Sequence, residues 1–84
     1  MRLIFSDRSW NDYLYWQQTD KQVLKKINSL IKDIQREPFG GIGKPEPLRY
    51  ELSGFWSRRI TDEHRLIYEV YENSIVIASC RYHY

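Results

Sequence analysis

The segment that follows Asp20 carries the clearest periodic pattern in the sequence. Its apolar residues are spaced by four, three, one and three positions: Val23, Ile27, Leu30, Ile31 and Ile34. This spacing places all of them on one face of an α-helix, and Thr19 or Asp20 is suited to cap its N-terminus. A helix with a single apolar face is stable only when that face is buried, so the rest of the chain must supply a surface that covers it.

A strand and a shorter helix are predicted ahead of this segment. The apolar stretch from Arg2 to Phe5 is a strand candidate, and Ser6 and Asp7 favour the start of a helix. In that helix the large residues at three- and four-residue spacing form one face, which two further aromatics widen: Trp10, Tyr13 and Leu14, then Tyr15 and Trp16. Packing against the core is the expected role of this face.

The pattern changes to a two-residue period after position 48. The segments RYEL, FWSRRIT, HRLIYEVY and SIVIASCRYH are separated by short polar turns, which is typical of successive antiparallel strands. The preceding stretch REPFGGIGKPEPL is rich in proline and glycine and is predicted to be a loop. We therefore expect an α+β fold in which two N-terminal helices pack on one face of a mainly antiparallel, twisted sheet.

The composition is that of a folded domain. Hydrophobic residues make up 42% of the chain and charged residues 29%, and one domain over residues 1–84 is expected. The single cysteine, Cys80, is expected to be a buried, reduced thiol. No stretch has the length and apolarity of a membrane span or signal peptide, and we predict a cytoplasmic protein. Because the net charge is only +2, any role with nucleic acid must depend on local clusters of cations.

Side chains alternate along a strand, so the more apolar set on each strand identifies the side that the helices cover. The predicted covered sets are Trp56, Arg58 and Ile60; Leu66, Tyr68 and Val70; and Val76, Ala78 and Cys80. The opposite side, which we call the open face, then receives four basic side chains: Arg59, Arg65, Arg81 and His83. A single β-bulge would reverse this assignment in the residues that follow it.

The basic side chains of the open face favour a ligand that carries phosphate. The planar fork of a guanidinium group matches phosphate oxygens, and Tyr82 and Tyr84 are suited to stack on unpaired bases, so RNA is the expected ligand. Cleaving RNA without a metal requires a base for the 2′-hydroxyl, an acid for the leaving 5′-oxygen and cations for the phosphorane oxygens. Glu46, whose backbone two prolines restrict, is the candidate base, and His83 is the candidate acid.

These residues also have plainer interpretations. A glutamate in a proline-rich loop is usually solvated, and a histidine near a chain end is often structural or exposed. Arg58 is expected in a salt bridge or at a sheet edge, and His64 in a turn or at the surface. No residue pattern suits a metal site, and no cofactor is expected. Two alternatives stay open: a module that binds RNA or the ribosome and blocks translation without cleavage, and a structural partner domain.

The sequence resembles the RelE/YoeB superfamily of type II toxin–antitoxin mRNA interferases over essentially its whole length. The stretches that carry the resemblance are LIFSDRSWNDYLYWQQTDK, INSLIKDIQREPF, GKPEPL, LSGFWSRRIT, EHRLIYEV and CRYHY. The resemblance implies a microbial RNase fold and a ribosome-dependent endoribonuclease that cleaves mRNA in the ribosomal A site. It also implies a YefM-like antitoxin as partner, and a homodimer.

The resemblance further implies roles for individual residues. In the catalytic step it assigns the general base, the transition-state cation and the general acid to Glu46, Arg65 and His83. In substrate binding it assigns phosphate contacts and placement of the scissile region to Arg59 and Tyr84. The family often has lysine where this chain has Arg49, which is therefore a weaker candidate for a substrate contact. Arg81 is given a supporting role in the same motif as His83.

Overall fold

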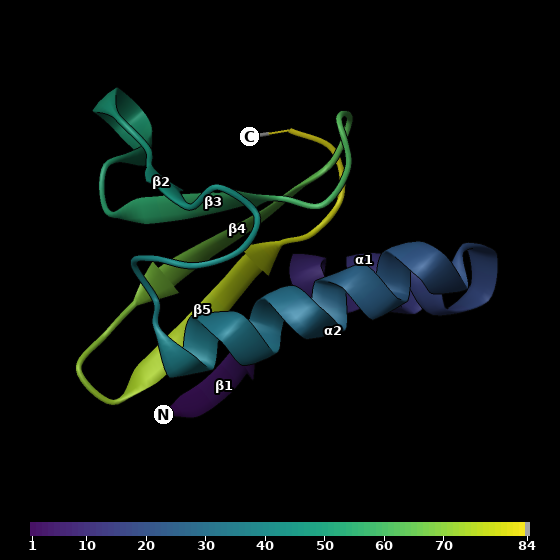
Figure 1. The fold of residues 1–84 in the computed structure, drawn as a ribbon, viewed down its shortest axis with the longest axis horizontal. Coiled ribbons are helices and arrows are strands. Elements are labelled where there is room, and N and C mark those ends of the chain that lie inside the picture. Colours follow the sequence, from purple (N-terminus) through teal and green to yellow (C-terminus); the bar gives the residue numbers. More distant parts are fainter. Residues whose placement is uncertain (84) are drawn as a thin grey trace.

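The computed structural model describes residues 1–83 and consists of two helices and a five-stranded sheet (Figure 1). The elements are β1 (Arg2–Phe5), α1 (Asp7–Thr19), α2 (Lys21–Arg36), β2 (Glu46–Pro47), the 3-10 helix η1 (Tyr50–Leu52), β3 (Phe55–Arg59), β4 (Arg65–Val70) and β5 (Ser74–Ser79). The strand order is β1-β5-β4-β3-β2, in which β1 runs parallel to β5 and the other neighbours are antiparallel. Within the described part of the chain, no helix has the length and apolarity needed to cross a membrane.

The two helices begin where the sequence predicts. The hydroxyl of Ser6 accepts a hydrogen bond from the backbone N–H of Ser9 at 3.1 Å, which caps α1. The carboxylate of Asp20 accepts from the N–H groups of Gln22 and Val23 at 3.1 and 3.2 Å, which caps α2. These side chains satisfy backbone donors that a helix leaves unpaired at its first turn.

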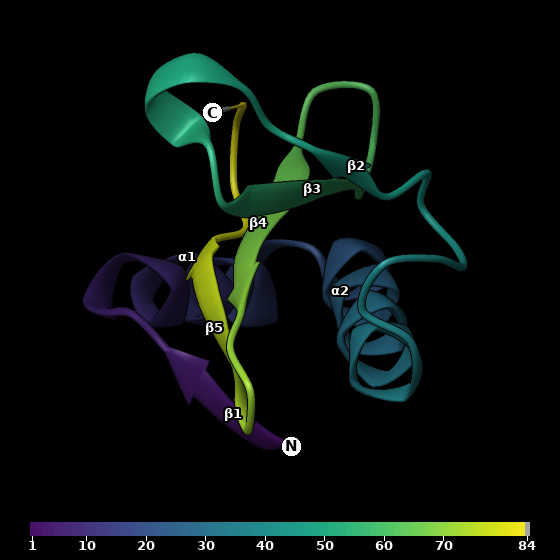
Figure 2. The same cartoon turned by 90° about the vertical axis from the view of Figure 1, so that its left-hand side faces the viewer.

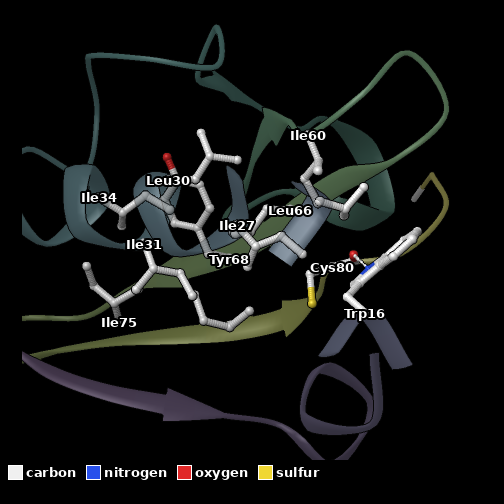
Figure 3. Packing of buried hydrophobic residues seen from close by; sticks show 12 residues of the cluster. Trp16, Ile27, Leu30, Ile31, Ile34, Ile60, Leu66, Tyr68, Ile75 and Cys80 are labelled. Carbon is white, nitrogen blue, oxygen red and sulfur yellow. Dashed lines mark hydrogen bonds between the residues drawn. The ribbon is translucent and has the colours of Figure 1, made fainter. Parts of the chain in front are cut away.

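The core lies between the sheet and the helices, which pack side by side on one face of it (Figures 1 and 2). The apolar face of α2 is buried as predicted, and Ile27, Leu30 and Ile34 are fully inaccessible to solvent. Figure 3 shows these side chains beside Leu66 and Tyr68 of β4. The predicted α+β architecture, with two helices on one face of a mainly antiparallel sheet, is therefore confirmed.

The region between the helices and β3 differs from the prediction in two respects. RYEL does not form a strand, because the chain turns at Tyr50, whose φ of 59° lies in the left-handed region, and continues as η1. The N–H of Leu52 donates to the carbonyl of Arg49 at 3.1 Å, a bond typical of a tight turn. The two residues Glu46 and Pro47, within the predicted loop, form β2 instead and pair with β3.

The covered face is predicted correctly for β3 and β4 but not for β5. In β5 the residues in the core are Ile75 and Ile77, both fully buried, and not Val76 and Ala78. The cause is a bulge in β5: Ile67 of β4 pairs with Ser79 and the next residue, Tyr68, pairs with Ile77, so Ala78 is the extra residue and has no partner in β4. A bulge of this kind reverses the alternation, and only Cys80 of the predicted β5 set is buried as expected.

Candidate active site

The loop before Glu46 is held by Arg58, a residue of β3 with no solvent exposure. One terminal nitrogen of its guanidinium donates to the carboxylate of Asp33 at 2.6 Å and to the carbonyl of Ile42 at 3.0 Å. The other donates to the carbonyls of Glu37 and Gly40 at 2.7 and 2.8 Å. Arg58 is therefore inward-facing and ion-paired, as the sequence indicates, and it fixes the chain between α2 and β2 from inside.

In the same loop, Gly43 packs closely against the core residue Leu30. The carbonyl of Gly43 accepts a hydrogen bond from the N–H of Arg59 at 2.7 Å, and its φ of 80° lies in the left-handed region. A β-carbon at this position would lie 2.7 Å from Cδ2 of Leu30, closer than side-chain carbons approach one another. Glycine is the residue that adopts this φ without strain and has no β-carbon to meet Leu30. The chain continues from here into β2 at Glu46.

Glu46 lies on the open face of the sheet. It is directly opposite Ser57 of β3, Ser57 is opposite Ile67 of β4, and Ile67 is opposite Ser79 of β5. Residues directly opposite one another in antiparallel strands project to the same side, so these four residues form one row across the open face. The side chain of Glu46 is exposed at the β2 end of this row.

Arg59 and Arg65 lie next to this row on the same face. Arg59 is two residues beyond Ser57, and it is directly opposite Arg65. One nitrogen of the Arg65 guanidinium is anchored by the β3–β4 turn, where it donates to the carbonyls of Thr61 at 2.5 Å and His64 at 3.0 Å. Like charges directly opposite one another in a sheet repel, so this pair creates a local preference for an anion.

The C-terminal segment is docked on α1 and on the start of β4. Trp16 donates from its indole nitrogen to the carbonyl of Cys80 at 2.8 Å, and the N–H of Cys80 donates to the carboxylate of Asp12 at 3.0 Å. The N–H of Tyr82 donates to Nδ1 of His64 at 2.7 Å. In Figures 1 and 2 this segment passes from the end of β5 toward the turn that contains η1.

His83 lies at the edge of the open face. It lines a cavity together with residues of α1, η1 and three strands: Arg8, Leu52, Phe55, Ile67, Ala78 and Ser79. Ile67 and Ser79 belong to the row that begins with Glu46. The fold therefore brings the open-face carboxylate of β2, the two arginines of β3 and β4, and the tail histidine to one side of the sheet.

The other predicted substrate contacts are placed differently. Arg49 is exposed and lines a second cavity with Glu46, Pro47, Leu48 and Tyr50. Arg81 does not lie on the open face as expected, because its guanidinium carbon lies 3.5 Å from the ring centroid of Tyr15 in α1 and 4.7 Å from that of Tyr82. The left-handed φ of 64° at Tyr82 turns His83 away from Arg81. Tyr84 lies outside the described residues.

Two further residues, His64 and Cys80, are involved in docking the tail. His64 lies in the β3–β4 turn, as the sequence indicates, but its side chain is only 12% exposed and contacts the tail. No sequence pattern links it to Tyr82, because the contact joins residues far apart in the chain. Burial raises the pKa of the Cys80 thiol to about 12, which makes the thiol a poor nucleophile, as the sequence suggests.

Comparison with known proteins places this chain among small bacterial toxins. A chain called toxin YoeB from Escherichia coli strain K12 is 68% identical to this sequence over 84 residues, and the match covers all of both chains. A YoeB dimer from Staphylococcus aureus matches with a TM-score of 0.93 and 53% identity, over 100% of this chain and 98% of that one. A heterotetrameric YoeB–YefM toxin–antitoxin complex from the same organism matches with a TM-score of 0.92 and 53% identity, with the same coverage.

A family model described as the YoeB-like toxin of bacterial type II toxin–antitoxin systems matches residues 5–84. The chain therefore belongs to the YoeB-like toxin family, as the resemblance in its motifs indicates.

Proposed function

We propose that this chain is a ribosome-dependent endoribonuclease that cleaves mRNA in the ribosomal A site and thereby inhibits translation. The observation that carries the proposal is the meeting of Glu46, Arg59, Arg65 and His83 on one side of the sheet. Membership of a toxin family supports an activity that harms the host cell. We further propose that residues 1–84 act as one toxin domain.

In the proposed reaction, the carboxylate of Glu46 takes the proton of the 2′-hydroxyl of the RNA while the 2′-oxygen attacks the adjacent phosphorus. The bond from phosphorus to the 5′-oxygen breaks, and His83 donates a proton to that leaving oxygen. The products are a 2′,3′-cyclic phosphate and a 5′-hydroxyl, and in this scheme the two side chains carry out both proton transfers without a metal or cofactor. Arg65 and Arg59 stabilise the negative charge of the phosphorane oxygens.

The spacing of the strands supports this division of roles. Two strand intervals separate Glu46 from Ile67, which lines the cavity at His83, and neighbouring strands lie about 5 Å apart. In the proposed complex, one sugar–phosphate unit spans the interval between Glu46 and the cavity that His83 lines. The exposed Arg49 is proposed as a further substrate contact beside Glu46, and Tyr84 as the residue that places the scissile region.

The partners follow from the family. We propose that the chain binds a YefM-like antitoxin and forms a homodimer, because S. aureus relatives of the same fold are described as a YoeB–YefM heterotetramer and as a YoeB dimer. With mRNA on the ribosome as the substrate, the proposed location is the cytoplasm. Arg81 has an indirect supporting role in this scheme, since it packs between Tyr15 and Tyr82.

The experiment that tests the function is primer-extension mapping of mRNA in a bacterial translation extract. Wild-type protein should produce discrete breaks within codons, and Glu46→Ala and His83→Ala should reduce them by about 100-fold or more, since a general acid or base contributes on this scale. A Lys21→Ala variant, altered on the exposed surface of α2, serves as the matched control and should cleave like wild type. Intact mRNA together with arrested protein synthesis would instead identify a binding module that does not cleave.

A further inference from the structure

We propose that His64 is a positioning residue for His83: its Nδ1 atom holds the backbone of Tyr82 and so determines where the next residue of the tail lies. This inference rests on the proposed function, in which His83 is the general acid. The central observation is the hydrogen bond of 2.7 Å from the Tyr82 N–H to Nδ1 of His64. A bond of this length is at the short end of the normal range.

Both polar backbone groups of Tyr82 are bound by consecutive residues at the start of β4. Nδ1 of His64 accepts a hydrogen bond from the N–H of Tyr82, and the N–H of Arg65 donates to the carbonyl of Tyr82 at 3.0 Å. Between these bonds, Tyr82 has a φ of 64°, a left-handed conformation that is costly for a residue with a β-carbon. Surrounding contacts are needed to maintain such a conformation. The two bonds supply them, and they fix the direction in which the chain leaves toward His83.

The imidazole of His64 is itself held in place. Its ring meets the ring of Trp16 edge-on, with centroids 4.8 Å apart at 80°, and the ring of Tyr82 at 5.6 Å. The carbonyl of His64 accepts from the N–H of Ile60 at 3.0 Å within the β3–β4 turn. A ring fixed on several sides presents Nδ1 in one direction, which suits it to position another group.

The hydrogen bond also determines the tautomer of His64. Because the Tyr82 N–H is the donor, Nδ1 must be unprotonated, and the proton of the neutral ring lies on Nε2. Nε2 faces the carboxylate of Glu63, with 3.8 Å between the two atoms. A side chain that replaces His64 must therefore offer an acceptor at the position of Nδ1, and ring shape alone is not enough.

Three substitutions separate the acceptor from the packing. His64→Asn places a carbonyl oxygen close to the position of Nδ1, His64→Leu has nearly the size of asparagine without an acceptor, and His64→Phe keeps an aromatic ring without an acceptor. We expect single-turnover cleavage on programmed ribosomes to fall about 10- to 100-fold in the leucine and phenylalanine variants, because small displacements of a catalytic group cost this much. The asparagine variant should recover most of the wild-type rate.

A second measurement reports on the tail without depending on cleavage. Hydrogen exchange of the Tyr82 amide, followed by NMR in each variant, should be slow in wild type and in His64→Asn, and fast in the leucine and phenylalanine variants. Melting temperatures identify any variant that fails to fold. A His64→Phe variant that cleaves as fast as wild type, or a His64→Asn variant as impaired as His64→Leu, would overturn the proposal.

Failure of the underlying function gives a different result. Wild-type protein that leaves mRNA intact would remove the proposed function and, with it, any role of His64 in cleavage. The Tyr82 amide would then still show whether His64 holds the tail. Loss of cleavage in His83→Ala, with the Tyr82 amide still protected, would show that the acid and its positioning residue act separately.

Discussion

Asp33 shows how much one carboxylate contributes to the candidate site. It accepts hydrogen bonds from Arg36 at 2.8 Å, from the N–H of Ile42 at 2.9 Å and from the buried Arg58 at 2.6 Å. These bonds hold the pKa of Asp33 well below its ordinary value, with Arg36 as the largest cause, followed by the Ile42 amide and Arg58. Asp33 thus neutralises the arginine that fixes the loop before Glu46.

The pH dependence of stability tests this interaction. Because the pKa of Asp33 is lowered on folding, the native state binds fewer protons than the unfolded chain, and the stabilisation is complete only above the unfolded pKa of about 3.9. It is lost as the pH falls below that value. Asp33→Asn, which has no such titration, should be less stable than wild type in urea at pH 7, and the difference should shrink at pH 3. An equal difference at both values would show that Asp33 is not the titrating group.

At the scale of elements, the loop from α2 to β2 can be tested with two glycines. Gly43 and Gly54 both have positive φ, but a β-carbon at Gly43 meets Leu30 at 2.7 Å whereas one at Gly54 meets nothing within 4 Å. Gly54→Ala should lower the free energy of unfolding by about 1 kcal/mol, from backbone strain alone. Gly43→Ala adds overpacking and should cost about 3 kcal/mol. Urea titrations compare the two, and equal losses would contradict the contact with Leu30.

The same elements show what the sequence can and cannot predict. Both helices and their caps were predictable, since the stripe from Val23 to Ile34 and the caps at Ser6 and Asp20 are local signals. The two-residue strand at Glu46 was not, because its pairing with β3 depends on a loop that Arg58 holds from within the core.

The candidate site was predictable in part. The motifs that carry the family resemblance include Glu46, Arg59, Arg65 and His83, and the fold places them on one side of the sheet. The position of Arg81 was predicted wrongly, because β5 ends at Ser79 and the guanidinium of Arg81 lies over the ring of Tyr15 in α1 instead of continuing the alternation of the strand. The contact of His64 with the tail could not be predicted, because it exists only after β4 and the tail have come together.

At the scale of the whole molecule, the tail joins parts of the fold that are far apart in the sequence. Cys80 is fully buried where α1, the sheet and the tail meet, and its sulfur lies 3.7 Å from the carbonyl of Ser9. Its backbone is bound to Asp12 and Trp16 of α1. His83 can hold a fixed position beside the open face only while this junction is intact, so the order of the candidate site depends on the core.

The reactivity of Cys80 therefore measures how the tail opens. Burial raises the pKa of this thiol to about 12, so at pH 8 the native protein should react very slowly with a disulfide reagent such as DTNB. If the tail separates from the core only on global unfolding, the free energy of opening obtained from labelling rates in urea should equal that obtained from tryptophan fluorescence. Trp16→Phe, which removes the donor to the Cys80 carbonyl, should lower the free energy of opening and the free energy of unfolding alike, by about 1–2 kcal/mol. Labelling much faster than global unfolding would show instead that the tail detaches on its own, and His83 would then occupy the open face only part of the time.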